Sequence, residues 1–170
     1  LQWRQLFRSL RLMELSGEVL SGHFFEGIPG LQFLSPEAFR LLREPLPLHA
    51  LFWISAADPA SLCGVPLAAL KDTLPPRVAS THLFYGGSRL VVVSRRSGRS
   101  VDIRVGTEDP HLPDYLSLFK DLLGREFNPF PKVLVEEING VPALRSPYAA
   151  ALQRCGFKTA RTGLELWREY

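Results

Sequence analysis

The sequence predicts an α+β fold in which a helix and a short hairpin are followed by an antiparallel, barrel-like sheet with flanking helices. Residues 1–15 have apolar side chains at helical spacing, whereas residues 99–105 alternate between apolar and polar side chains, as half-buried antiparallel strands do. The 14 prolines and 13 glycines in 170 residues exclude one long helical bundle.

The first region, residues 1–44, combines helices with a hairpin. Its first helix, residues 1–15, is followed by short strand patterns that flank a Gly-Ile-Pro-Gly turn at residues 27–30. A second helix starts behind Ser35, which precedes a proline at the first helical position. A helix followed by a hairpin is the second half of a winged helix, in which the recognition helix meets DNA and the hairpin is the wing. We therefore expect residues 1–44 to be the C-terminal half of a winged-helix domain.

The second region, residues 45–170, is predicted to be an α+β domain that begins with a proline-rich linker at residues 45–49. Residues 81–105 carry the signals of three consecutive strands, and the run Leu90–Val93 is apolar on both faces. Such a run suits a strand inside a barrel or under a helix. An amphipathic helix at residues 110–123 and further strands complete the pattern of a barrel-like sheet with flanking helices.

The charge of the chain is unevenly distributed. The formal net charge is only +3, but residues 51–106 hold seven basic and three acidic side chains. A basic block of this size permits contact with nucleic acid.

Three arginines of the first helix are candidate nucleic-acid contacts. Arg4, Arg8 and Arg11 fall together on the side opposite the apolar stripe, and guanidinium groups match phosphate oxygens in pairs. The alternative is a solvated charged face on a surface helix. The wing itself has no Lys or Arg, only His23 and two phenylalanines.

A second set of candidates is the arginine tip, which we define as Arg95, Arg96 and Arg99. These residues surround a turn between two predicted strands. Like charges at this spacing repel, so an anionic partner would relieve the arrangement. The alternative is a solvated loop tip.

Local motifs of catalysis are absent from the sequence. There is no phosphate-binding G-x-x-x-x-G-K-[ST] loop, no G-x-G-x-x-G and no G-x-S-x-G elbow, so no catalytic residue is assigned and enzyme activity stays an open question. The four histidines and two cysteines lack metal-ligand spacing, and we expect no metal. Two cysteines and no long apolar run favour a reducing, cytoplasmic location without a membrane span. Because Leu1 is not an initiator, we expect the chain to belong to a longer one.

The stretch Leu10–Arg43 resembles the winged-helix end of large helicase-related (Lhr) proteins. Shorter blocks at Ser55–Gly64 and Glu137–Trp167 are also similar to that family. His23 replaces the basic residue that the family has in the wing. The residues that carry the first match are Glu14, Gly17, Glu18, Gly22, Phe24, Gly27, Gly30, Gln32, Phe33, Pro36, Glu37 and Ala38.

The resemblance implies a role in an ATP-dependent superfamily 2 helicase or translocase of DNA repair. This chain would be a DEAD/DEAH box helicase-associated, nucleic-acid-binding accessory region that holds the tracking single strand. The motor domains of the same longer chain would bind ATP and Mg and hydrolyse the ATP, so we expect no cofactor in this region itself. The implied partners are single-stranded DNA or a DNA/RNA hybrid, and the motor domains.

Two alternatives belong to other classes. Some Lhr proteins have a region related to winged-helix DNA glycosylases, which use a Q-x-Q-like motif to position a water; no Q-x-Q occurs here. The other alternative is a protein-interaction module that docks on the helicase motor or on a repair partner.

Overall fold

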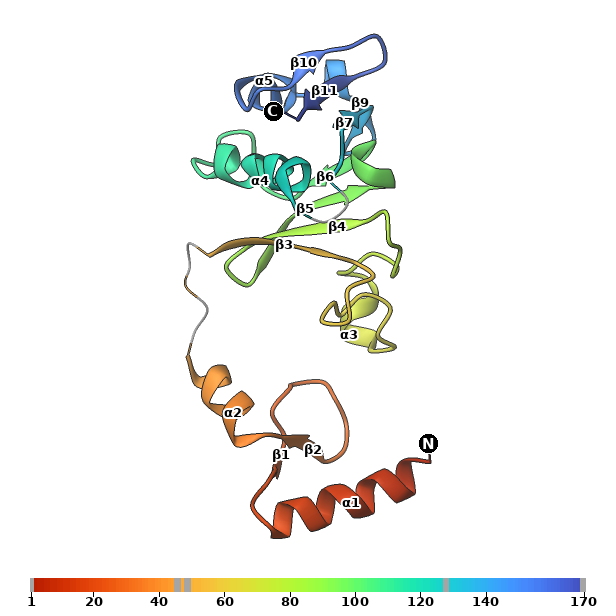
Figure 1. The fold of residues 1–170 in the computed structure, drawn as a ribbon, viewed down its shortest axis with the longest axis vertical. Helices are drawn as coiled ribbons and strands as arrows, with labels where there is room; N and C mark the ends of the chain where they lie inside the picture. The colour runs from red at the N-terminus through yellow and green to blue at the C-terminus, as the bar shows by residue number, and fades with distance from the viewer. Residues whose placement is uncertain (1, 45–46, 48–49, 127–128, 169–170) are drawn as a thin grey trace. The chain divides into compact units, whose positions relative to one another are not determined.

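The computed structural model describes residues 2–44, 47, 50–126 and 129–168 (Figure 1). The chain forms two compact units, Leu1–Leu46 and Pro47–Tyr170. The linker expected at residues 45–49 and the domain boundary expected after residue 44 lie outside the described residues, apart from Pro47.

The first unit contains two helices and a two-stranded antiparallel hairpin between them. Leu20 pairs with Leu34 at one end of the hairpin and Gly22 pairs with Gln32 at the other. This order of helix, wing and helix is the one that the sequence predicts. The elements are α1 (Trp3–Leu15), β1 (Leu20–Gly22), β2 (Gln32–Leu34) and α2 (Pro36–Arg43).

Two side chains set the local structure of the wing and of α2. The Gln32 amide oxygen accepts hydrogen bonds from the backbone N–H groups of Phe24 and Phe25, both at 2.8 Å, and its nitrogen donates to the carbonyl of Ile28 at 3.0 Å. One amide thus closes the loop between the two short strands. The Ser35 hydroxyl accepts from a backbone N–H in the first turn of α2 at 3.1 Å, so Ser35 is the N-cap that the sequence predicts.

Apolar side chains of the first unit are open to solvent. No described residue of this unit is fully buried. Trp3 is 58% and Leu15 is 80% exposed, so part of the apolar surface of α1 is uncovered.

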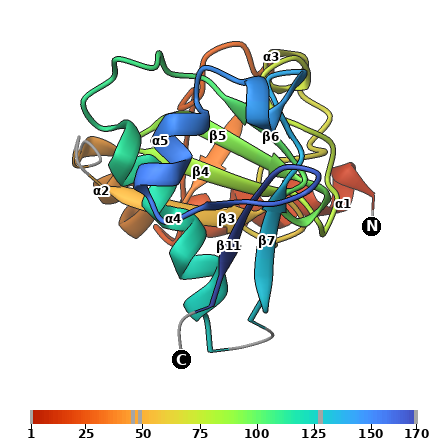
Figure 2. The ribbon, with the colours of Figure 1, turned by 90° about the horizontal axis from the view of Figure 1, so that it is seen from above.

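The second unit is built on a six-stranded sheet and a three-stranded sheet (Figure 1). In the larger sheet the strand order is β3-β4-β5-β6-β8-β9, and only the β6–β8 pair is parallel. In the smaller sheet the order is β10-β11-β7, and Figure 2 shows β11 and β7 side by side. The strands are β3 (Leu51–Ser55), β4 (His82–Gly86), β5 (Arg89–Arg95), β6 (Ser100–Ile103), β7 (Lys132–Val135), β8 (Glu137–Ile138), β9 (Val141–Pro142), β10 (Lys158–Thr159) and β11 (Leu164–Trp167); the helices are α3 (Ala68–Lys71), α4 (Leu112–Gly124) and α5 (Ala149–Arg154).

The fold is α+β as expected, but the sheets do not form a closed barrel in the described part of the chain. The larger sheet ends at β3 on one side and β9 on the other. The run Leu90–Val93 is apolar on both faces because a separate layer covers each face of the sheet, and this arrangement requires no closure. The backbone N–H of Glu136 donates to the Arg99 carbonyl at 2.8 Å, where the chain leaves the smaller sheet and enters the larger one.

Helix α4 forms the main core with one face of the larger sheet. The Phe119 ring of α4 contacts Phe84 of β4 edge-on at 4.8 Å between centroids, and it contacts Phe157 at 5.6 Å. The opposite face carries a smaller core that includes Cys63 and Leu83, under the segment that contains α3. Figure 1 shows α4 and α3 on opposite sides of the sheet. Among the described helices, none has the length and apolarity that crossing a membrane requires.

The side-chain amide of Asn139 pairs with the backbone of Ile103 at the end of β6, as a neighbouring strand would. Its amide oxygen accepts from the N–H of Ile103 at 2.7 Å, and its amide nitrogen donates to the Ile103 carbonyl at 2.9 Å. The residue has a left-handed backbone, with a φ of 50°, at the Asn-Gly turn between β8 and β9. Asn139 therefore forms part of the turn and, through its side chain, also links the end of β6 to β8.

We predict that Asn139→Gly lowers the free energy of unfolding by about 2 kcal/mol, because two hydrogen bonds to a half-buried backbone are lost. Glycine keeps the left-handed backbone, so strain does not contribute. Urea unfolding followed by far-UV circular dichroism measures the change. Ser97→Gly, at a similar φ of 56°, is the control and should change the free energy by less than about 0.5 kcal/mol. Equal stabilities of the two variants would contradict this role of Asn139.

Candidate nucleic-acid interface

Helix α1 presents two arginines that no carboxylate of the described residues neutralises. Arg4 and Arg8 are exposed, and among the described residues no carboxylate lies within ion-pair distance of either one. Arg11, the third candidate of this helix, is paired with Glu14 one turn further on. The three arginines predicted from the sequence therefore lie on one helix, but of the three only Arg11 has a carboxylate partner among the described residues.

Each member of the arginine tip has a carboxylate partner within the same unit. Arg95 pairs with Asp102, Arg96 lies 3.7 Å from Glu137, and Arg99 lies 3.9 Å from Glu136. The repulsion expected from the sequence is thus relieved internally. Exposed ion pairs contribute only about 0–1 kcal/mol each, so a phosphate can compete with the carboxylates for these guanidinium groups.

The backbone of the arginine tip is fixed in shape. Arg96 and Ser97 are left-handed, with φ of 51° and 56°, and Gly98 has a φ of 101°. A Cβ atom on Gly98 would lie 2.5 Å from the Val133 side chain, so only glycine lets the turn pack on β7. The tip therefore holds its arginines on a rigid turn.

Two further arginines are anchored to backbone carbonyls instead of carboxylates. Arg77 donates to the carbonyls of Ala57 at 3.1 Å and Asp58 at 2.9 Å, and Arg104 donates to the Thr73 carbonyl at 2.9 Å. These contacts fix the direction of each guanidinium group and leave its positive charge in place. Sequence reasoning missed both residues; the basic excess of residues 51–106 is the signal that contains them.

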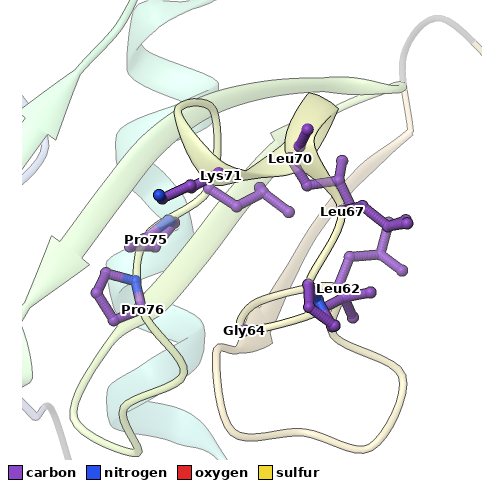
Figure 3. Close-up of a pocket in the computed structure, with 11 residues that line it drawn as sticks. Leu62, Gly64, Leu67, Leu70, Lys71, Pro75 and Pro76 are labelled. Atoms are coloured by element: carbon purple, nitrogen blue, oxygen red, sulfur yellow. The ribbon is translucent and has the colours of Figure 1, made fainter. Parts of the chain in front are cut away.

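A cavity of about 490 Å³ lies in the segment between β3 and β4. In Figure 3, Leu62 and Leu67 lie on one side of the hollow and Pro75 and Pro76 on the other. Lys71 is the charged side chain in its lining. The walls carry no carboxylate, histidine or thiol that could act on a substrate, so the cavity fits a binding role better than a catalytic one.

His82 is a buried histidine between two aromatic rings. Its ring centroid lies 5.5 Å from Trp53 and 5.7 Å from Phe130, and its Nδ1 atom has no hydrogen-bond partner among the described residues. Burial, with a smaller contribution from the charge of Arg125, lowers the pKa of His82 from 6.5 to about 4. His82 is only 2% exposed.

No metal centre is formed by the residues that the structure describes, because no three His, Cys, Asp or Glu side chains gather there to hold an ion.

Of the wing residues, Phe24 is half-buried against Phe39, with ring centroids 5.9 Å apart, whereas Phe25 is 50% exposed. Trp3 and Trp167 are 58% and 52% exposed.

The helix, wing and exposed arginines of the first unit define a winged-helix domain, and comparison with known proteins identifies its class. Residues 1–50 match the family model described as large helicase-related protein, winged-helix domain. The resemblance inferred from the sequence is thereby confirmed, and the first unit is a winged-helix domain of the Lhr type.

A particular relative is similar along nearly the whole chain. Over 165 residues the chain is 28% identical to the protein named Lhr helicase/uracil glycosylase from Escherichia coli (strain K12). The match covers 91% of this chain and 10% of that protein, so the chain spans about a tenth of the length of the relative.

We predict that the second unit loses stability in acid through His82. Because its pKa is lower in the folded state, folding favours the neutral ring. The contribution is complete above pH 6.5 and is lost as the pH falls from 6.5 to about 4, by about 3 kcal/mol in all. Urea unfolding at a series of pH values measures the loss.

In that series, His82→Phe should remove this part of the pH dependence, because phenylalanine keeps the aromatic packing and does not titrate. His111→Gln, at an exposed histidine, is the control and should keep the dependence of the natural chain. Identical pH profiles for His82→Phe and the natural chain would contradict the assignment.

Proposed function

We propose that this chain is a nucleic-acid-binding accessory region of an ATP-dependent Lhr-type helicase or translocase that acts in DNA repair. One observation carries the proposal: a winged-helix domain of this family exposes Arg4 and Arg8 on its first described helix, and no carboxylate of the described residues pairs with them. Guanidinium groups in this state bind phosphates without first breaking an internal ion pair.

In this proposal the chain holds the tracking single strand, of DNA or within a DNA/RNA hybrid, in the cytoplasm. Arg4 and Arg8 supply the first phosphate contacts, and Arg11 joins them when it exchanges Glu14 for a phosphate. Arg95, Arg96 and Arg99 add contacts by the same exchange with Asp102, Glu136 and Glu137. Binding of ATP and Mg belongs to the motor domains of a longer protein, which are the second partner.

We expect Arg4→Ala/Arg8→Ala to weaken single-strand binding about tenfold at 0.1 M salt, because two phosphate contacts are lost. The slope of log affinity against log salt should become shallower by about 1.4, since each contact with a single strand contributes about 0.7. Fluorescence anisotropy with a labelled oligothymidine at several salt concentrations gives both numbers, and a labelled duplex tests the preference for a single strand.

The matched control is Arg40→Ala/Arg43→Ala, which removes the same charge from α2 of the same unit. If both double variants lose affinity equally, only net charge matters and the assignment to α1 fails. Arg95→Ala/Arg96→Ala/Arg99→Ala enters the same titration, and an unchanged affinity and slope would remove the arginine tip from the interface.

A second candidate function is removal of uracil from DNA, which is favoured by the name of the E. coli relative. A glycosylase needs a pocket for a flipped base and a group that activates water. The test is release of free uracil from a uracil-containing single strand by this chain alone. Release would support the glycosylase function and overturn a purely accessory role, and no release would remove it for this substrate.

A third candidate, docking on other protein, is favoured by the apolar side of the first unit. A hollow of about 570 Å³ lies between α1 and the wing, lined by Trp3, Phe7, Leu10, Ile28, Pro29, Gly30, Leu31, Gln32 and Phe33. A chain that binds no strand at low salt, but binds helicase motor domains and loses that binding in Trp3→Ser, would be a docking module. Salt-sensitive strand binding without motor binding would remove this candidate.

A further inference from the structure

We propose that Phe52 and Tyr85 form a stacking platform for one base of a single-stranded nucleic acid, with Arg104 near Tyr85 and Arg77 in the segment between β3 and β4 to bind the backbone. This inference rests on the proposed function, since it assigns a second contact for the same strand. It concerns only the second unit, on the sheet face opposite α4.

The rings of Phe52 and Tyr85 are stacked in the parallel arrangement that a nucleic-acid base adopts on an aromatic side chain. Phe52 of β3 and Tyr85 of β4 are opposite each other in the antiparallel register. Their rings are stacked, with centroids 5.0 Å apart and planes 8° apart. Tyr85 covers one face of the Phe52 ring, and Phe52 remains 37% exposed. β3 has no further strand on its outer side among the described residues, so the second face of that ring lies toward the sheet edge.

The smaller core of the second unit supports the platform through Tyr85. Tyr85 is half-buried and packs against the small core that contains Cys63, Leu83 and Val93. Burial raises the pKa of the Tyr85 hydroxyl, the nearby Cys63 acts in the same direction, and the charge of Arg104 opposes them. Tyr85 is therefore held in place by packing, and binding a base costs little ordering of the side chains.

Arg104, near Tyr85, and Arg77, in the segment between β3 and β4, are held by backbone carbonyls and not by carboxylates of the described residues. The charge of Arg104 is near enough to act on Tyr85, and its guanidinium group is anchored to the Thr73 carbonyl. Arg77 is anchored to the carbonyls of Ala57 and Asp58, and its side chain lies against Gly64, next to Cys63. None of the carboxylates of the described residues is within ion-pair distance of either arginine. Two fixed positive charges on the same unit as an aromatic surface complement a polyanion.

A single strand is the partner that uses both features. Every base has an apolar face that can stack on an aromatic side chain, and each stacked base contributes about 1–3 kcal/mol. Bases in a duplex are already stacked on one another and cannot reach the platform. An apolar peptide would use the rings but leave the two guanidinium charges without a function.

We expect Phe52→Leu to weaken binding of a fluorescent oligothymidine about tenfold, which is the loss of one stacked base. The slope against salt should stay the same because no charge changes. Phe52→Tyr should restore binding, since it restores a ring. Arg77→Gln/Arg104→Gln should instead make the salt slope shallower by about 1.4. Trp167→Leu, at an exposed aromatic residue elsewhere in the second unit, is the matched control and should bind normally.

An abasic strand of the same length separates stacking from all other effects. The natural chain and Phe52→Leu should bind it equally, because it has no base to stack. Far-UV circular dichroism and the thermal midpoint show that Phe52→Leu is folded. A difference between the two proteins on the abasic strand, or none on the oligothymidine, would overturn the platform.

Failure of the platform and failure of the proposed function are distinguishable. If Arg4→Ala/Arg8→Ala weakens binding while Phe52→Leu binds normally, the platform is wrong and the accessory role stands. If the natural chain binds no strand at low salt, both are wrong. Binding of an acidic aromatic peptide in preference to the oligothymidine, lost in Phe52→Leu, would assign the surface to a protein partner and also overturn the platform.

Discussion

The second unit depends on the contact of Phe119 with Phe84 and Phe157. The three rings join α4, the centre of the larger sheet and the segment after α5, with centroid distances of 4.8 and 5.6 Å from Phe119. Burying a phenylalanine contributes about 1.5–3 kcal/mol, and each edge-on aromatic pair adds about 0.5–1.5 kcal/mol. Because α4 is fixed in this way, one face of the sheet is sealed and is not open to a ligand.

The base-stacking site that we propose therefore lies on the face that α4 does not cover. The segment between β3 and β4 covers only part of that face, over Cys63, Leu83 and Val93. At its margin the rings of Phe52 and Tyr85 stay partly open, and the same segment supplies the carbonyls that anchor Arg77 and Arg104. Because the segment between β3 and β4 covers this face only in part, it leaves the aromatic surface open and also anchors the two arginines.

The charges of the chain fall into two groups that differ in what they can bind. Arg95, Arg96 and Arg99 are balanced by carboxylates of their own unit, whereas no carboxylate of the described residues balances Arg4 or Arg8. Balanced arginines help to hold the turn between β5 and β6 against the strands around it and must exchange partners before they bind a phosphate. Unbalanced arginines gain from a phosphate directly, which is why we place the first contacts of the strand on α1.

Local patterns in the sequence predicted much of the fold. The alternation of Val101, Ile103 and Val105 predicted a half-buried strand, and all three residues are buried. The sequence around Ser35 predicted the start of α2, and the Ser35 hydroxyl caps that helix. These features follow from steric preferences and capping within a few residues, so a sequence contains them directly.

Contacts between distant parts of the chain could not be predicted in the same way. The partners of Arg96 and Arg99 are Glu137 and Glu136, about forty residues later, and nothing local indicates that β8 lies parallel to β6. The burial of His82 also depends on Phe130 from another segment. An apolar run with two buried faces could not distinguish a barrel from a sheet covered on both sides, and the described sheets remain open.

We propose that a single strand is bound by the unbalanced arginines and the exposed rings of this chain. Photo-crosslinking with an oligonucleotide that carries 5-iodouracil, followed by mass spectrometry of the linked peptides, tests this directly because the probe reacts with aromatic side chains that stack on it. We expect crosslinks at Phe52 or Tyr85, and we expect unlabelled single strand and high salt both to suppress them. Efficient crosslinks confined to Trp167, or a crosslinking yield that is insensitive to salt, would contradict it.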